Sequence, residues 1–343
     1  MTSAPGSRAA GAPAGAAAES ELRAPHRRQA PGRRLREKAV VLGYRAGEAL
    51  LGHLPLGPTS TVGGLVGLAS YAVWPEKRRI VRANCARVLG LPESDPAVGR
   101  LARRIYRNQV RWILEVMRLG HLAPDEIRAQ IDDRGADEFH AAWQASRGVI
   151  AVGLHLANNE ACLAALAGRG WPMHAVADDT AYEELFAHLA RERERWGVNL
   201  VPWRNLREVF RVLRRHEILG LLVDWGYRPD GIPVRFFGAW TTFPAGPAVL
   251  AAKSGATIVP FWFRRRPDGA FDGGAGPYIT VASAEPGELA RATQALAAAL
   301  EAGVRRAPEQ WCVFKPIWPA DPAEGRRLAA LHAEQAGSGA PAG

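Results

Sequence analysis

Two side chains, His155 and Glu160, have the types and the spacing that acid–base chemistry needs. They lie in 150-IAVGLHLANNEACLAAL-166, where an apolar stretch ends at His155 and a helical pattern opens at Glu160. A histidine titrates near neutral pH and can take a proton from a hydroxyl, provided that a carboxylate fixes its tautomer and stabilises the imidazolium. We therefore predict that His155 is a general base and that Glu160 orients it.

The same pattern also has a purely structural interpretation. A histidine at the end of a strand can be a satisfied strand-end residue, and an acid in the first turn of a helix is favoured by the helix dipole. The spacing H-x4-E does not by itself separate a catalytic pair from these two structural roles. The decision depends on the elements that position the two side chains and on the rest of the chain.

Short apolar runs alternate with amphipathic helical patterns between residues 148 and 263. Strands separated by helices of this length imply crossover connections and a largely parallel sheet. We expect an α/β fold with a largely parallel central sheet flanked by helices. His155 then stands at the carboxyl end of the first strand, where open α/β sheets collect their sites. The predicted strands are 148–154, 173–177, 198–202, 218–223 and 257–263, and the predicted helices are 158–168, 181–196, 204–215 and 286–303.

Changes of composition divide the chain into four parts. We expect a flexible basic tail over 1–35, a helical, membrane-associating region over 36–125, the α/β core over 126–320 and a C-terminal tail over 321–343. Within the core, 264–277 has the turn-forming composition of a loop.

Residues 49–75 contain no Asp, Glu, Lys or Arg, and this uncharged stretch is long enough to cross a bilayer. Pro55, Pro58 and a run of Gly and Thr interrupt this stretch. We therefore expect it to be interfacial or part of a core, with a single transmembrane span as the less favoured alternative.

The formal net charge of +10 favours an anionic partner, which nucleic acid, anionic lipid and acidic proteins all are. No recognition helix or RNA-binding pattern accompanies the charge, so we expect no nucleic-acid partner. Eleven Trp residues, several beside basic residues as at Trp74 and Trp262, suit a lipid headgroup zone. We expect a peripheral protein on the anionic cytoplasmic face of the inner or plasma membrane. Three cysteines without a CxxC argue against a disulfide framework and a metal site.

Four blocks of sequence occur together in this chain. The H-x4-E segment is followed by 219-LGLLVDWGYRPDGIPVRFFG-238, then 243-FPAGPAVLAAKSGATIVPFWF-263, and finally 308-PEQWCVFKPIW-318. The combination resembles the bacterial late acyltransferases of lipid A biosynthesis and the related phosphatidylinositol mannoside acyltransferases, within the lysophospholipid acyltransferase superfamily. The resemblance runs from about Val40 to Trp318, and the blocks together are far more specific than any one of them.

The resemblance implies direct transfer of a fatty acyl group from a thioester donor, acyl-CoA or acyl carrier protein, to a hydroxyl of a glycolipid or phospholipid. No cofactor is needed beyond these substrates. On the matching positions, His155 is the base and Glu160 its partner. Asp224 matches the first aspartate of a D-x-D-like segment, and Arg193 matches an R-x-R-x-G element and is expected to bind a phosphate or help hold Asp224. Phe236, Phe237 and Gly238 match a turn that shapes the pocket.

Two positions depart from the family pattern. Gly226 stands at the second acidic position of the D-x-D segment, and Ala239 follows the FFG turn where the mannoside enzymes tend to carry a glutamate. These departures leave Glu160 as the expected acid of the pair. They also leave open an alternative function, a non-catalytic lipid-binding protein on the same fold.

Overall fold

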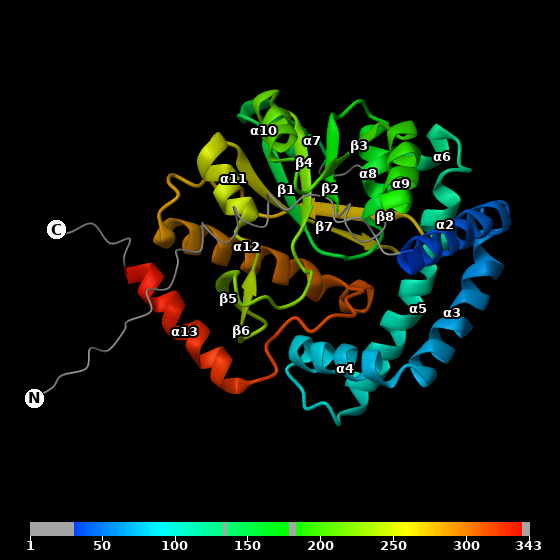
Figure 1. Cartoon of the computed structure of the whole chain (residues 1–343), viewed down its shortest axis with the longest axis horizontal. Helices are drawn as coiled ribbons and strands as arrows, with labels where there is room; N and C mark the ends of the chain where they lie inside the picture. Colours follow the sequence, from blue (N-terminus) through cyan, green and yellow to red (C-terminus); the bar gives the residue numbers. More distant parts are fainter. Residues whose placement is uncertain (1–30, 133–135, 178–182, 338–343) are drawn as a thin grey trace, which may run out of the picture.

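The computed structural model describes residues 31–132, 136–177 and 183–337. Its centre is a six-stranded sheet in the order β3-β2-β4-β1-β7-β8 (Figure 1), in which only β8 runs antiparallel to its neighbour. The strands are β1 (Val149–Gly153), β2 (Met173–Ala177), β3 (Val198–Pro202), β4 (Ile218–Leu222), β7 (Thr257–Arg265) and β8 (Phe271–Ala275). The predicted α/β class with a largely parallel sheet is confirmed.

Helices cover both faces of the sheet, because side chains alternate along each buried strand. On β1, Ile150 and Val152 face the core shared with α10 (Leu206–Arg214), α11 (Gly246–Ser254) and α12 (Pro286–Arg306). Val149 and Ala151 face the core shared with α8 (Asn159–Ala167). The remaining elements of this second face are α6 (Pro124–Arg128), α7 (Ala136–Ala145) and α9 (Glu183–Arg195).

The helical region expected before the core is present as α2 (Pro31–Leu51), α3 (Leu56–Val73), α4 (Pro75–Leu89) and α5 (Pro96–Leu119), drawn blue to cyan-green in Figure 1. The sequence fixes the start of α5, since the Asp95 side chain accepts from the Ala97 N–H and Pro96 occupies the first helical position. Leu101 and Ile105 are buried on its inner face. In the part of the chain that the structure describes, no helix has the length and apolar character of a membrane span.

Two sequence-based expectations are wrong. The segment 264–277 is the β7–β8 hairpin rather than a loop, because Phe271 is buried at the start of β8. Most of the expected C-terminal tail is α13 (Pro322–Gly337), which buries Leu328 against α12 and a second sheet, the antiparallel pair β5 (Ile232–Phe236) and β6 (Ala239–Phe243). Residues 1–30 of the expected tail at 1–35 lie outside the described part of the chain. Residues 31–35 form the start of α2, which begins at Pro31.

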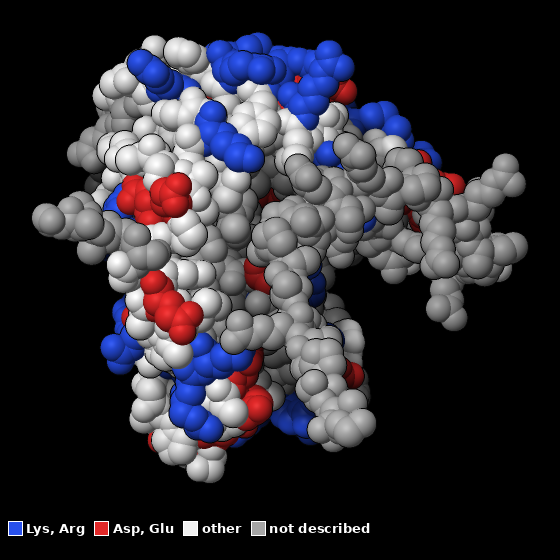
Figure 2. Space-filling view, turned by 60° about the vertical axis from the view of Figure 1, so that its left-hand side comes forward, with Lys and Arg blue, Asp and Glu red and all other residues white. Residues whose placement is uncertain are grey.

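Basic side chains gather over α10. Arg207, Arg211 and Arg214 of this helix are exposed, and Lys and Arg crowd the top of the molecule in Figure 2, where α10 lies in Figure 1. The buried side of α10 carries Val209, Val212 and Leu213, as the helical pattern predicts.

Candidate active site

His155 and Asp224 meet where the neighbouring strands β1 and β4 end. The His155 Nδ1 lies 2.7 Å from Asp224 Oδ1, and the His155 backbone N–H donates to Asp224 Oδ2 at 2.8 Å. The Trp311 indole N–H also donates to Oδ2, at 2.9 Å. With Nδ1 held as the donor to Asp224, the neutral imidazole carries its lone pair on Nε2. This nitrogen is the one left for a substrate.

The electrostatics of the pair suit a base. Burial opposes ionisation of Asp224, yet the charge of His155 and the hydrogen bonds from His155 and Trp311 hold the pKa of the carboxyl below its usual value. Burial also opposes charging of His155, but the attraction and hydrogen bond of Asp224 outweigh it and raise the pKa of the imidazole. The pair therefore consists of an ionised carboxylate and an imidazole of increased basicity.

The loop that carries His155 is braced by η1 (Pro308–Gln310) and by the segment that follows it. The Cys312 N–H donates to the His155 carbonyl at 3.0 Å, and the Ala157 N–H donates to the Gln310 carbonyl at 3.1 Å. From the other side, the Asn159 side chain donates to the Leu154 carbonyl at 2.8 Å. These contacts fix the backbone on both sides of the imidazole, so its orientation is set before any ligand binds.

Glu160 pairs with Arg193 rather than with His155. The guanidinium is bidentate, with Nε 2.7 Å from Oε2 and Nη2 2.6 Å from Oε1, and Arg193 is buried. The predicted contact between Glu160 and His155 is therefore wrong, as is the expectation that Arg193 helps hold Asp224. Glu160 lies in the first turn of α8 and turns its carboxylate to the neighbouring helix α9, whereas Asp224 follows the strand next to β1. Glu160 still helps to raise the pKa of His155 through its charge.

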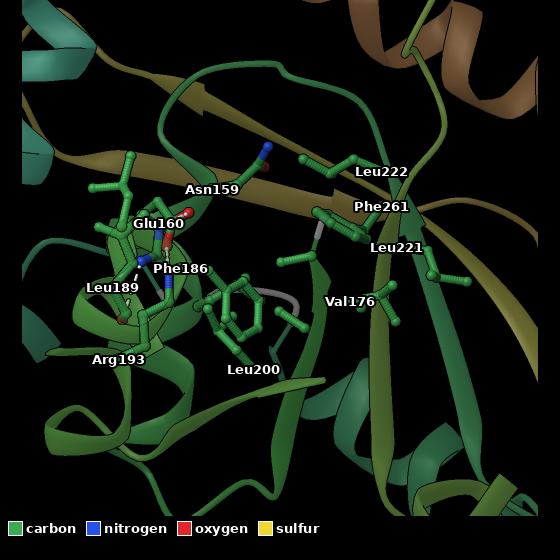
Figure 3. A pocket seen from close by; sticks show the side chains of 15 residues that line it. Asn159, Glu160, Val176, Phe186, Leu189, Arg193, Leu200, Leu221, Leu222 and Phe261 are labelled. Carbon is green, nitrogen blue, oxygen red and sulfur yellow. Dashed lines mark hydrogen bonds and ion pairs between the residues drawn. The ribbon is translucent and has the colours of Figure 1, made fainter. Parts of the chain in front are cut away.

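An apolar cavity of about 190 Å³ lies beside the Glu160–Arg193 pair. Helices α8 and α9 and the strands β2, β3 and β4 enclose it. Figure 3 shows the Glu160–Arg193 pair on one side of the cavity and Leu221, Leu222 and Phe261 on the other. Leu222 precedes Asp224 by two residues, and the Phe261 ring packs against Gly153, two residues before His155, so this second side lies close to the His155–Asp224 pair although neither member lines the cavity. The remaining apolar lining includes Leu163, Val176, Phe186, Leu189 and Leu200.

The FFG residues are placed elsewhere. Phe236 ends β5, while Phe237 and Gly238 have positive φ values of 49° and 72° and form the turn into β6. The ring of Phe236 lies 5.9 Å from that of Trp311, edge to face, and both phenylalanines are buried. The expectation that this turn shapes the cavity beside His155 is wrong, since the turn supports the indole that holds Asp224.

The local backbone explains why position 226 is a glycine. Its φ is 103°, and a Cβ there would meet the Cβ of Lys315 at 3.2 Å. An aspartate at this position would be strained and crowded. The second acid of the D-x-D pattern therefore has no place in this backbone.

Trp311 and Trp225 were missed as individual site residues. The ring of Trp225 lies 5.4 Å from that of His155, edge to face, and about half of this side chain's surface is exposed. Both tryptophans stand inside blocks that the sequence singled out, directly after Asp224 and in 308–318. Their aromatic type gave no signal that separated a site residue from a core residue.

Burial governs the chemistry of two of the cysteines. Burial raises the pKa of the Cys85 and Cys312 thiols to about 12, so these thiols are protonated at neutral pH. Among the described residues, no group of three or more His, Cys, Asp or Glu side chains is arranged to hold a metal ion.

Residues 32–319 match the family model of bacterial lipid A biosynthesis acyltransferases. The chain belongs to this family. It is similar to the phosphatidylinositol mannoside acyltransferase of Mycolicibacterium smegmatis, with 29% identity over 83% of this chain and 93% of the relative. The protein of the same name from Mycobacterium tuberculosis H37Rv is 30% identical over 72% of this chain and 79% of the relative. As a member of the lipid A biosynthesis acyltransferase family, the protein is an O-acyltransferase of lipid or glycolipid biosynthesis.

Proposed function

We propose that this acyltransferase moves a fatty acyl group from a thioester donor to a hydroxyl of a glycolipid or phospholipid, with His155 as the general base and Asp224 as the group that orients it. The observation that carries the proposal is the 2.7 Å contact between His155 Nδ1 and a buried, ionised Asp224 beside an apolar cavity. Glu160, which the sequence favoured as the orienting acid, has a supporting role in this proposal.

The chemical steps follow from the tautomer of His155. Nε2 takes the proton of the acceptor hydroxyl as its oxygen attacks the thioester carbonyl carbon. Asp224 stabilises the imidazolium that forms, and the same imidazolium then gives its proton to the departing thiolate as the carbon–sulfur bond breaks. The products are an ester and a free thiol, without a covalent intermediate on the protein.

The cavity supports the choice of a fatty acyl group. Its lining is mainly aliphatic and aromatic, and water is displaced from such a surface when an acyl chain enters. The donor thioester is acyl-CoA or acyl carrier protein, and the exposed arginines of α10 would attract the phosphates of the first or the acidic surface of the second. The names of the two relatives support an anionic glycolipid as the acceptor.

Peripheral binding at the cytoplasmic face of the membrane is part of the proposal. Large apolar side chains are exposed along α2 and α3, and α3 carries no charged residue. Exposed apolar side chains of this kind favour insertion into the headgroup zone of a bilayer. The exposed apolar side chains of α2 and α3 are Leu35, Val40, Leu42, Leu50, Val62, Leu65, Val66 and Val73.

The test is the variant His155→Ala with a radiolabelled acyl thioester and membrane lipid as acceptor. We expect transfer to fall by about 10³-fold or more, because a positioned base and its partner contribute on this scale. His332→Ala on α13 is the matched control and is expected to retain activity. Undiminished transfer by His155→Ala would remove this residue as the base. Lipid binding without transfer by the unaltered protein would instead favour the non-catalytic alternative.

A further inference from the structure

Two exposed indole rings and two lysine ammonium groups lie along a path that ends at His155. Lys77 lies over the ring of Trp74 at 5.9 Å, and its ammonium donates to the Phe314 carbonyl at 3.3 Å. The next residue, Lys315, lies over the ring of Trp225 at 4.8 Å. We call Trp74, Lys77, Lys315 and Trp225 the Trp–Lys strip.

The strip is charged and open. In the part of the chain that the structure describes, no carboxylate forms an ion pair with either lysine, and Lys315 is exposed. Trp74 is 51% exposed and Trp225 47%, which is unusual for the largest apolar side chain. Two exposed indoles with an exposed and a half-buried lysine, beside the proposed base, have the composition of a binding surface rather than of a core.

The backbone beneath the strip is fixed. The Asn84 side chain donates to the Lys315 carbonyl at 2.9 Å, and the Tyr227 N–H donates to the Pro316 carbonyl at 2.8 Å. Gly226 allows these two segments to pack closely, as the 3.2 Å approach to Lys315 indicates. The lysine and the indole are therefore presented from rigid positions, which lowers the entropy lost when a ligand binds.

The strip is separate from the apolar cavity. None of its four residues lines the cavity, whose walls come from α8, α9 and the strands. At its other end, the strip begins at Trp74, where α3 with its exposed apolar side chains ends. A lipid whose acyl tails lie beside α3 would thus extend its headgroup along the strip to His155.

We propose that the Trp–Lys strip binds the phosphate-bearing sugar headgroup of the acceptor lipid. Lysine ammonium groups without a carboxylate partner suit a phosphate, and an exposed indole offers an apolar face to a sugar ring with a donor at its edge. The inference rests on the proposed function, since it assigns the strip to the acceptor and the cavity to the acyl chain of the donor.

Steady-state transfer from palmitoyl-CoA tests the assignment, with a phosphatidylinositol mannoside as the anionic acceptor and a mannosyl diacylglycerol as the neutral one. We expect Lys315→Gln to raise KM for the anionic acceptor about tenfold, the loss of one charge-assisted contact, and to leave KM for the neutral acceptor and for palmitoyl-CoA unchanged. Trp225→Leu is expected to raise KM for both acceptors. Lys253→Gln on α11 and Tyr278→Leu are matched exposed controls. A KM for the anionic acceptor equal to that of the controls would overturn the inference.

A binding measurement separates this inference from the proposed chemistry. The deacylated headgroup of the same phosphatidylinositol mannoside is titrated into the full chain carrying His155→Ala, by calorimetry. We expect binding that weakens about tenfold when Lys315→Gln is added and that persists with Lys253→Gln. If the headgroup does not bind, or binds equally after Lys315→Gln, the strip is not the acceptor site. Loss of the proposed base function would leave this binding result unchanged.

Discussion

Two partly buried ion pairs, His155 with Asp224 and Glu160 with Arg193, lie side by side at the end of β1. In sequence, Glu160 is the acid nearest to His155. In the structure, the His155 imidazole contacts Asp224 and the Glu160 carboxylate contacts Arg193. Strand pairing explains this choice, because β1 and β4 are neighbours and their carboxyl ends coincide.

Replacing each acid by its amide separates the two roles. Asp224→Asn keeps the shape of the side chain but places an N–H₂ group or a weaker acceptor next to Nδ1. The imidazole is then no longer held with its proton on Nδ1, and it loses its charged partner. We expect kcat to fall by about 10³–10⁴-fold, the scale seen when the orienting aspartate of a catalytic triad is changed to Asn. Glu160→Gln is expected to lower kcat by less than about tenfold. Initial rates with a labelled thioester donor decide the matter, and a larger loss for Glu160→Gln would restore Glu160 as the orienting acid.

The raised pKa of His155 predicts the pH dependence of the reaction. The base works only when neutral, so kcat/KM falls as the pH drops through the pKa of His155, which lies above its ordinary value of 6.5. Asp224→Asn removes the main cause that raises this pKa and leaves the burial that lowers it. The acidic limb of the residual activity should therefore move to lower pH. A limb that stays in place would show that another group sets it.

At the scale of elements, the Glu160–Arg193 pair joins α8 to α9 at one side of the cavity. Glu160→Gln leaves the buried Arg193 without its counter-charge, and breaking a buried pair in this way costs about 3 kcal/mol. Denaturant unfolding should show this loss of stability while most of the activity is retained at low temperature. The exposed pair Arg228–Asp230 provides a control, because Asp230→Asn should change the free energy of unfolding by about 1 kcal/mol or less.

At the scale of the whole molecule, the α/β core has the exposed apolar face of α2 and α3 at one end (Figure 1). We expect Leu65→Gln with Val66→Gln to weaken binding to anionic lipid vesicles by about tenfold or more, since each exposed side chain contributes about 1 kcal/mol when it enters the bilayer. Co-sedimentation measures this partition. Leu206→Gln on α10 is the control, because it makes the same kind of change on a different helix. Equal binding by the unaltered protein, the α3 double variant and this control would place the membrane contact elsewhere.

The sequence by itself determined the class of the fold, the five parallel strands of the central sheet and the place of His155, because these follow from the spacing of apolar side chains along the chain. It also determined the family, since the four blocks occur in order and at their proper distances. Strand β8 and helix α13 were not predicted, because their large apolar side chains are few and are buried by neighbours from other elements.

Only the tertiary structure decided which carboxylate serves the base. Strand order brings residues 155 and 224 together across 69 positions, and hydrogen bonds from His155 and Trp311 then hold Asp224 ionised. It likewise decided that the FFG turn supports Trp311 rather than the cavity. Sequence distance carries no information about such pairs, because the contacts form across strands and loops whose order in the sheet differs from their order in the chain.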